Sequence, residues 1–214
     1  MSKIYLEIFD EERLWVFEKL VFFNKVGILA GGTAIALQIK HRKSFDFDVF
    51  TKSEITEHLR QKVRKVLGYT SRIIKDSTNQ IDVITPNNVK VTFVKHPSLP
   101  LHPIIKTDSI SLFSLPDLAS NKAYTIGRRG TWRDYVDLFF LLKEGHVTLG
   151  SVIKETEKRF GAEFNQRLFL QQLLYTADLV EFGIDYIGRK YKPQQIIDYF
   201  EKVVKDFSKT KFAI

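Results

Sequence analysis

The chain has 214 residues, of which 44% are hydrophobic and 27% are charged, a composition typical of a globular protein with a substantial core. A formal net charge of +8 favours a polyanionic partner such as a nucleotide or a nucleic acid. The absence of cysteine excludes disulfides, thiolate metal sites and cysteine nucleophiles. No segment has the composition of a signal peptide or of a membrane span of about 20 apolar residues, so we expect a cytoplasmic protein with no membrane partner.

The first predicted elements are a helix and a short strand. A helix is predicted over residues 10–25, with Asp10 as its N-cap and an apolar stripe that includes Leu14 and Phe17. Gly27 is expected to end this helix. Residues 28–30 then form an apolar run between glycines, which is typical of a buried strand that stops at a tight turn.

The turn after this strand carries the residue types of a phosphate site. Gly31 and Gly32 allow close approach of backbone N–H groups and of a helix N-terminus, and the Thr33 hydroxyl is a further donor. A short helix is predicted to follow, and a basic cluster over residues 40–43 comes next.

Two aspartates follow the basic cluster on a predicted strand. Apolar and acidic residues alternate over residues 45–49, which places Asp46 and Asp48 on one face of that strand. Because adjacent carboxylates repel, such a pair is typical of a cation site. Mg²⁺ takes a few carboxylate oxygens and leaves its other positions to water and phosphate, so we predict Mg²⁺ at Asp46 and Asp48. The alternative is a solvated strand face beside an ordinary glycine turn.

A helix and three strands are predicted next. Thr51 and Glu54 match a capping box, so a helix is predicted from there to Gly68, with a basic outer face that we interpret as solvated and, alternatively, as a nucleic-acid contact. The predicted strands cover residues 69–74, 81–85 and 89–94. The expected fold class is therefore α/β, a small mixed sheet with flanking helices.

Residues 96–105 contain three of the six prolines and are predicted to be an extended connector. We therefore expect an α/β domain over residues 1–105 and a helical domain over residues 106–214 that completes the site. The helical pattern of the second domain is clearest from Pro193 onward.

A second group of polar residues lies on two predicted helices within residues 114–142. The first helix starts at Ser114 and is expected to end at Gly127. Thr131 and Asp134 then match a second capping box. Around the turn between the helices lie Lys122, Arg128, Arg129, Arg133, Asp134 and Asp137.

These two blocks carry a resemblance. The sequence GGTA followed by Arg-x-Ser-x-Asp-x-Asp resembles the nucleotidyltransferase fold of the DNA polymerase beta superfamily, and more closely the AbiEii/AbiGii toxin family. The matching positions are Gly31, Gly32, Thr33, Arg42, Ser44, Asp46 and Asp48. The second block of that family is matched by Lys122, Arg129 or Arg128, Arg133, Asp134 and Asp137.

The resemblance implies an enzyme that transfers a nucleotide from an NTP to an acceptor hydroxyl, as the toxin of a toxin–antitoxin system. It implies Mg²⁺ at Asp46 and Asp48, a catalytic Lys122, and Asp137 or Asp134 near the reacting atoms, one of them as a base. The nucleotide-binding residues it implies are Gly31, Gly32, Thr33, Arg42, Ser44 and Arg129. By analogy it further implies RNA, such as a tRNA 3′ end, as acceptor and a protein antitoxin as partner.

The chain departs from the family pattern at one position. Superfamily members with a full metal site have a third carboxylate on a later strand, and residues 89–94 contain none. Asp82 on the preceding strand can replace it only if the strand order brings Asp82 beside the Asp46/Asp48 strand. The alternatives are a non-catalytic protein that binds nucleotide or a partner, and a phosphotransferase that acts on a protein hydroxyl.

Overall fold

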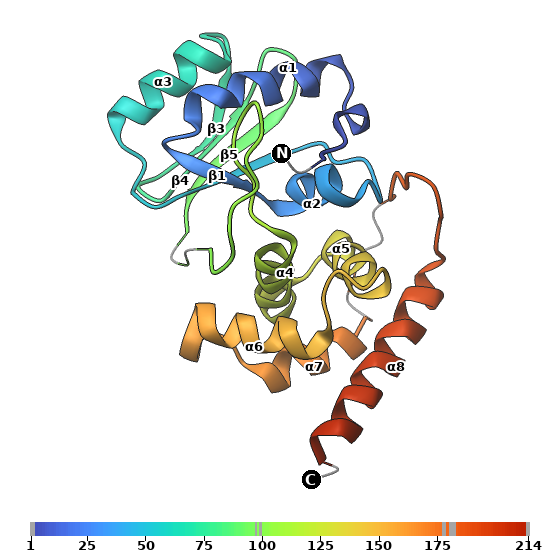
Figure 1. The fold of residues 1–214 in the computed structure, drawn as a ribbon. Helices are drawn as coiled ribbons and strands as arrows, with labels where there is room; N and C mark the ends of the chain where they lie inside the picture. Colours follow the sequence, from blue (N-terminus) through green and yellow to red (C-terminus); the bar gives the residue numbers. More distant parts are fainter. Residues whose placement is uncertain (1–2, 97, 99, 177–178, 180–182, 213–214) are drawn as a thin grey trace. The chain divides into compact units, whose positions relative to one another are not determined.

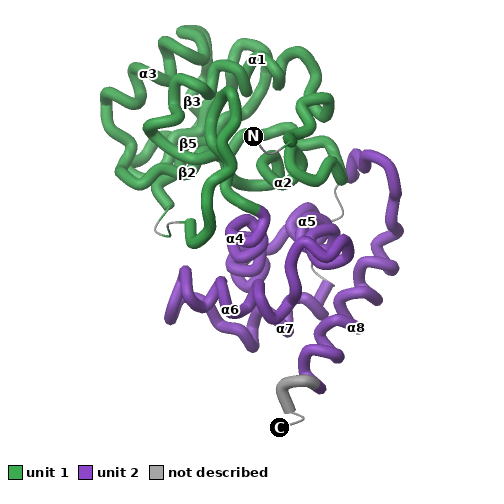
Figure 2. The backbone as a smooth tube through the Cα atoms, in the orientation of Figure 1, with its two compact units in different colours: residues 1–114 green, residues 115–214 purple. Residues whose placement is uncertain are grey.

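A computed structural model describes residues 3–96, 98, 100–176, 179 and 183–212. The chain divides into two compact units, Met1–Ser114 and Leu115–Ile214 (Figure 2). Hydrophobic side chains fill the interior of each unit. The division into domains 1–105 and 106–214 stays a prediction, because compactness alone does not show that a segment folds independently.

The first unit is built on a five-stranded sheet (Figure 1). The strand order is β1-β2-β5-β4-β3, in which β2 and β5 are parallel and the other neighbours are antiparallel. This is the small mixed sheet that the sequence predicts. The strands are β1 (Gly27–Ala30), β2 (Phe47–Thr51), β3 (Arg72–Asp76), β4 (Gln80–Ile84) and β5 (Lys90–Lys95).

The helices of this unit begin with α1 (Glu11–Lys19), capped by Asp10, whose side chain accepts from the Arg13 N–H at 3.0 Å. The prediction that this helix runs to residue 25 is wrong, because the chain tightens into the 3₁₀ helix η2 (Leu20–Phe23). In a 3₁₀ helix residues three apart share a face, so both Leu20 and Phe23 are fully buried. The remaining helices of the unit are η1 (Leu6–Ile8), α2 (Gly31–Ile39) and α3 (Glu57–Leu67).

Helix α3 starts later than its predicted capping box. Thr51 belongs to β2, and its hydroxyl donates to the Ser53 carbonyl at 2.8 Å. Thr56 is the N-cap, and its side chain accepts from the Leu59 N–H at 3.2 Å. The capping box at residues 51–54 is therefore a wrong prediction.

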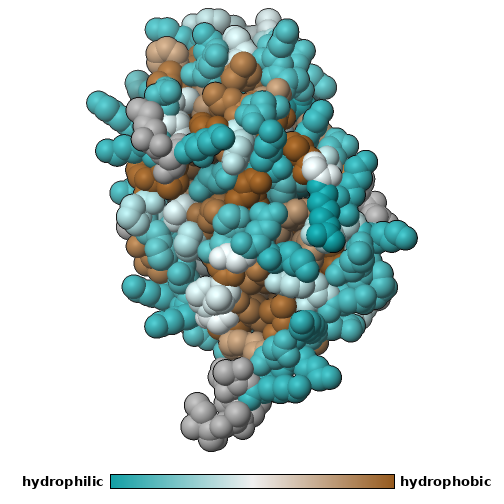
Figure 3. All heavy atoms as spheres, turned by 45° about the vertical axis from the view of Figure 1, so that its right-hand side comes forward, coloured by the Kyte–Doolittle hydropathy of each residue, from teal (hydrophilic) through white to brown (hydrophobic). Residues whose placement is uncertain are grey.

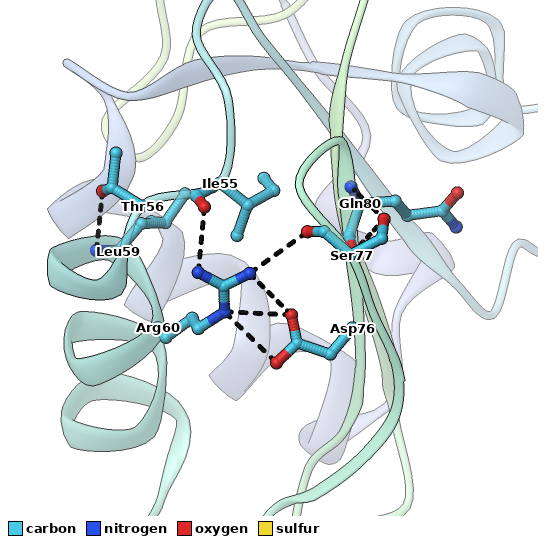
Figure 4. A network of polar contacts seen from close by, with 7 residues as sticks. All are labelled: Ile55, Thr56, Leu59, Arg60, Asp76, Ser77 and Gln80. Atoms are coloured by element: carbon cyan, nitrogen blue, oxygen red, sulfur yellow. Dashed lines mark hydrogen bonds and ion pairs between the residues drawn. The ribbon is translucent and has the colours of Figure 1, made fainter.

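Arg60 fixes α3 to the far edge of the sheet (Figure 4). Its Nε lies 2.9 Å from Asp76 Oδ1 at the end of β3, and its Nη2 donates to the Ser77 carbonyl at 3.2 Å. Its Nη1 donates to the Ile55 carbonyl at 2.9 Å, just before the helix. Helices α1 and α3 lie side by side and cover one side of the sheet (Figure 1).

The two outer strands of the sheet are protected in different ways. At β1, the Leu29 N–H donates to the Ser111 carbonyl at 2.9 Å, and the Phe113 N–H donates to the Leu29 carbonyl at 3.0 Å. At β3, the pairing with β4 is irregular between Ile73 and Lys75, and most of the strand is exposed. The predicted strand 69–74 is shifted in the structure, because a turn from Gly68 precedes β3.

The second unit consists of helices, with α4 packed against α5, α6 and α7. Helix α4 continues past Gly127, so the predicted end there is wrong. A Cβ at this position would meet only Phe169, at 3.8 Å, and the glycine is therefore an ordinary helical residue. The helices are α4 (Leu115–Arg129), α5 (Trp132–Lys143), α6 (Leu149–Phe160), η3 (Gly161–Glu163), α7 (Gln166–Leu174) and α8 (Pro193–Phe212).

Among the described residues, no helix has both the length and the apolar character that a bilayer crossing requires. Figure 3 shows hydrophobic side chains interspersed with hydrophilic ones on one face of the molecule.

Candidate active site

The glycine turn between β1 and α2 is held against the carboxylate of Asp48. Gly31 has a φ of +66°, a conformation that side chains rarely adopt. A Cβ on Gly31 would lie 2.4 Å from Asp48 Oδ2, so the turn also needs the space that only glycine leaves. Ala30 provides no side-chain cap for α2, and the first N–H groups of this helix, which includes Gly32, are thus available to an anion.

Thr33 joins the start of α2 to the segment before β2. Its hydroxyl is buried and donates to the Asp46 carbonyl, an atom that can only accept. The single hydroxyl proton is thereby used, so Ser44 Oγ, 2.8 Å away, is the donor toward Thr33. Both hydroxyls fix the backbone beside the aspartates, and their direct contact with phosphate stays a prediction.

The two aspartates differ in their setting. β2 begins at Phe47, so Asp46 precedes the strand and is exposed, while Asp48 lies within it and is half-buried. The predicted strand of residues 45–49 is thus displaced by two residues. The burial pattern keeps the predicted alternation, because Phe47 and Val49 point to the core. Arg42 is buried, and its Nη1 donates to the Lys43 carbonyl at 2.9 Å.

Asp82 does not adjoin the Asp46/Asp48 strand. In the sheet register Asp48 is opposite Thr92 of β5, and Thr92 is opposite Asp82 of β4. One strand therefore separates the two aspartates, whose Cα atoms lie about 10 Å apart at the usual strand spacing. The Asp82 carboxylate accepts from Gln80 Nε2 at 2.7 Å and lies 3.4 Å from Lys90 Nζ.

The chemistry of this donor set fits one Mg²⁺ ion. The described residues contain no cluster of three or more histidine, cysteine, aspartate or glutamate side chains that could hold a metal. Mg²⁺ is commonly bound by one or two carboxylates together with water and substrate phosphates. Asp46 and Asp48 satisfy that requirement, whereas a site of two metals bridged by three carboxylates is not provided by β2, β4 and β5.

In the second unit Lys122 lies between two aspartates. Lys122 Nζ of α4 is 2.7 Å from Asp134 Oδ1 and 2.7 Å from Asp137 Oδ2, both on α5. The Asp137 side chain is completely buried, and that of Asp134 is 13% exposed. The capping-box prediction is confirmed, because Asp134 Oδ2 accepts from the Thr131 N–H at 2.9 Å and from the Thr131 hydroxyl at 2.8 Å.

The Lys122 cation determines the ionisation of Asp134. Burial raises the pKa of this carboxyl, but the Lys122 charge, the hydrogen bond from Lys122 and the Thr131 N–H outweigh it, so the pKa of Asp134 is lowered. Asp134 is therefore held as a carboxylate. Arg133 is four residues before Asp137 on α5, a spacing that allows an ion pair, but Arg133 makes no ion pair with any described residue.

The structure describes the side chain of only one of the two arginines at the end of α4. Arg128 is exposed, and its Nη2 lies 3.2 Å from Glu163 Oε2. Arg129 is helical, but its side chain lies outside the described part, so its role in nucleotide binding stays a prediction.

Asn121 is a candidate ligand-binding residue that the sequence did not indicate. It precedes Lys122 on α4, and both polar atoms of its amide are buried without a hydrogen-bond partner among the described residues. Such atoms are costly unless a ligand or water satisfies them. Its only signal in the sequence is its position beside Lys122.

One family model and one curated relative match most of the chain. Residues 16–186 match the family model described as "Nucleotidyl transferase AbiEii toxin, Type IV TA system". An uncharacterized protein of Aquifex aeolicus (strain VF5) is 26% identical over 188 residues, which are 84% of this chain and 86% of that protein.

Three solved structures share the fold. One is a Helicobacter pylori protein provisionally named a nucleotidyltransferase (TM-score 0.59, 16% identity, 94% of this chain and 97% of that chain). Another is JHP933 from Helicobacter pylori (TM-score 0.55, 16% identity, 98% and 97%). The third is MenT4, a nucleotidyltransferase toxin from Mycobacterium tuberculosis (TM-score 0.57, 12% identity, 91% and 83%). The match of the family model over most of the chain, together with this fold, shows that the protein belongs to the AbiEii nucleotidyl transferase toxin family.

Proposed function

We propose that the protein transfers a nucleotide from an NTP to an acceptor hydroxyl in a reaction that depends on Mg²⁺. The observation that carries this proposal is the packing of the Asp48 carboxylate against the Gly31 turn, at the uncapped N-terminus of α2. The proposed metal ligand on β2 and the helix end that would bind phosphate are thereby adjacent. Family membership supports the same reaction class.

The first unit would bind the triphosphate. Asp46 and Asp48 would hold Mg²⁺, which neutralises charge on the phosphoryl oxygens when it is bound. The N–H groups at Gly31 and Gly32 would donate to phosphate oxygens. Thr33 and Ser44 would keep the aspartate segment in place through their shared hydrogen bonds.

The second unit would supply a cation and a base. Lys122 would stabilise the departing pyrophosphate. Asp137 would orient the Lys122 side chain, because the fully buried Asp137 carboxylate contacts this lysine directly. Asp134 is the member of the aspartate pair with exposed surface, so it would accept the proton of the acceptor hydroxyl. Arg42 and Arg129 would add phosphate contacts.

The acceptor that we propose is RNA, with the 3′ end of a tRNA as a specific case, and the proposed protein partner is an antitoxin. The net charge of +8 favours RNA without specifying a sequence. A non-catalytic binding protein is the second candidate, because Thr92 is opposite Asp48 where a third carboxylate would complete a full metal site. A phosphotransferase acting on a protein hydroxyl is the third.

The test incubates the purified protein with each α-labelled NTP, Mg²⁺ and total cellular RNA, and follows label and pyrophosphate. We expect label on RNA with stoichiometric pyrophosphate. Label from a γ-labelled NTP on protein, with release of a nucleoside diphosphate, would instead establish the phosphotransferase. Saturable NTP binding without transfer would establish the non-catalytic protein.

A separate prediction concerns Asn121. Asn121→Leu should lower NTP affinity about tenfold, the loss expected when a polar contact to a ligand is removed. The same change should leave the free energy of unfolding unchanged or raise it by about 1 kcal/mol, because it removes buried polar atoms that have no partner. Isothermal calorimetry and urea unfolding measure the two effects. A less stable variant with unchanged NTP affinity would contradict the proposed contact.

A further inference from the structure

A groove in the first unit has the properties of a nucleic-acid surface. It has a volume of about 800 Å³ and runs between η2 and α3. Its lining includes Lys19, Phe22, His58, Lys62, Lys65 and Tyr69.

Within the described part of the chain, two lysines of this groove lie over aromatic rings, but none is paired with a carboxylate. Lys19 Nζ is 5.6 Å from the centroid of the Trp15 ring, and Lys62 Nζ is 5.5 Å from that of Phe23. No carboxylate of the described residues lies within ion-pair distance of Lys19, Lys62 or Lys65. Arg60 on the same helix differs, because its guanidinium is committed to Asp76 (Figure 4). Lys65 in the last turn of α3 and Lys19 in the last turn of α1 complement the dipoles of their helices, whereas Lys62 lies outside the last turn of α3.

Two large aromatic side chains project from the same groove. Tyr69 is 78% exposed and Phe22 is 56% exposed. Aromatic residues at such exposure contribute little to the core, but their faces are available for stacking. Bases of single strands stack on such side chains while lysines and arginines bind the intervening phosphates. A single strand of nucleic acid would use both features of the groove, the charges and the aromatic faces.

The groove continues toward the start of β1. A neighbouring hollow shares His58 and Lys62 with it, and adds Lys25 and Thr51. Glu54 also lines this hollow, but its carboxylate lies 3.0 Å from Lys95 Nζ and is thereby neutralised. The positive surface is therefore continuous along the hollow.

This surface is separate from the candidate active site. Thr51 pairs with Gly27 at the first residue of β1, whereas the Gly31 turn follows the last residue. A strand of four residues spans about 10 Å. A nucleic acid in the groove would therefore be held at a distance from the reacting hydroxyl.

We infer that the groove between η2 and α3 binds an unpaired segment of RNA. Phe22 and Tyr69 stack on bases, while the three lysines and Arg64, which also lines the groove, bind phosphates. This inference rests on the proposed function for the identity of the nucleic acid, because the acceptor proposed there is RNA. Within that function the groove holds the body of the acceptor.

The test measures fluorescence anisotropy of a labelled 12-nucleotide unpaired RNA without NTP. Lys62→Ala/Lys65→Ala should weaken binding about tenfold and reduce the slope of log affinity against log salt by about 1 to 2. Lys154→Ala/Lys158→Ala on α6 is the matched control, because it removes the same charge from exposed positions elsewhere and should change affinity less than twofold. An equal loss of RNA affinity in both double variants would overturn the inference, because RNA would then be attracted by the overall positive charge of the protein and not by this groove.

The aromatic contribution is tested independently. Phe22→Ala/Tyr69→Ala keeps the net charge and should weaken binding at least tenfold. Tyr175→Ala, at another exposed tyrosine, is its control. Unchanged affinity in the aromatic variant, with RNA displaced by polyglutamate, would overturn the inference in favour of an acidic polypeptide. Asp48→Asn should bind the RNA normally but transfer no nucleotide, so failure of the groove and failure of the proposed reaction are distinguishable.

Discussion

Asp48→Asn should lower the rate of nucleotide transfer about 10³-fold or more. A bound metal stabilises charge in the transition state by several kcal/mol, and each 1.36 kcal/mol corresponds to a factor of ten in rate. The amide has nearly the shape of the carboxylate, so the melting temperature should remain close to that of the wild type. The measurement is the single-turnover rate of α-label transfer, together with NTP binding in the presence and absence of Mg²⁺.

Asp82→Asn is the control for this effect. Asp82 is also a sheet aspartate, but β5 separates it from Asp48 and its carboxylate lies near Lys90. The control should retain the wild-type rate and the Mg²⁺ dependence of NTP binding. If Asp48→Asn binds NTP with the same Mg²⁺ dependence as the wild type, Asp48 is not a metal ligand.

Lys122→Met should lower the free energy of unfolding by about 3–5 kcal/mol, the cost typical of removing one partner from a buried ion pair. The change leaves Asp134 and the fully buried Asp137 without the cation that lies 2.7 Å from each of them. Transfer activity should be lost as well. Urea unfolding at pH 7 measures the stability effect, and Lys154→Met at an exposed lysine should change it by less than about 0.5 kcal/mol.

The pH dependence of the stability of Lys122→Met distinguishes the loss of the buried ion pair from a loss of packing. In the wild type the pKa of Asp134 is lowered, so its contribution to stability is complete above the unfolded value of about 4 and is lost as pH falls through the folded pKa. Without Lys122, burial and the neighbouring Asp137 should raise the folded-state pKa of Asp134, so the variant should become more stable as the pH falls from 7 to 5. Asp137→Asn in the Lys122→Met background should recover part of the lost stability. A pH-independent loss would contradict the electrostatic account.

The core of the candidate site could be predicted from the sequence because its signals are local. The Gly31 turn and the alternation around Asp48 are fixed by residues a few positions apart, and the capping box at Thr131 lies within four residues. Family membership confirms the resemblance that these motifs carry.

Other features depended on contacts that the sequence does not contain. Thr51 and Glu54 have the spacing of a capping box, but Thr51 is paired with Gly27 in the sheet. Helix α3 therefore begins later, after its N-cap Thr56. Asp82 could be placed only once β5 was known to lie between β4 and β2. The unpartnered amide of Asn121 likewise arises from long-range packing.

The two outer strands of the sheet limit how another chain could associate with the protein. An outer strand with free N–H and C=O groups can recruit a further strand and lead to aggregation. Here β1 is covered by residues 111–113 of its own chain, and β3 is interrupted by an irregular register and carries Arg72, Lys75 and Asp76. With both outer strands protected in this way, the sheet resists edge-to-edge polymerisation.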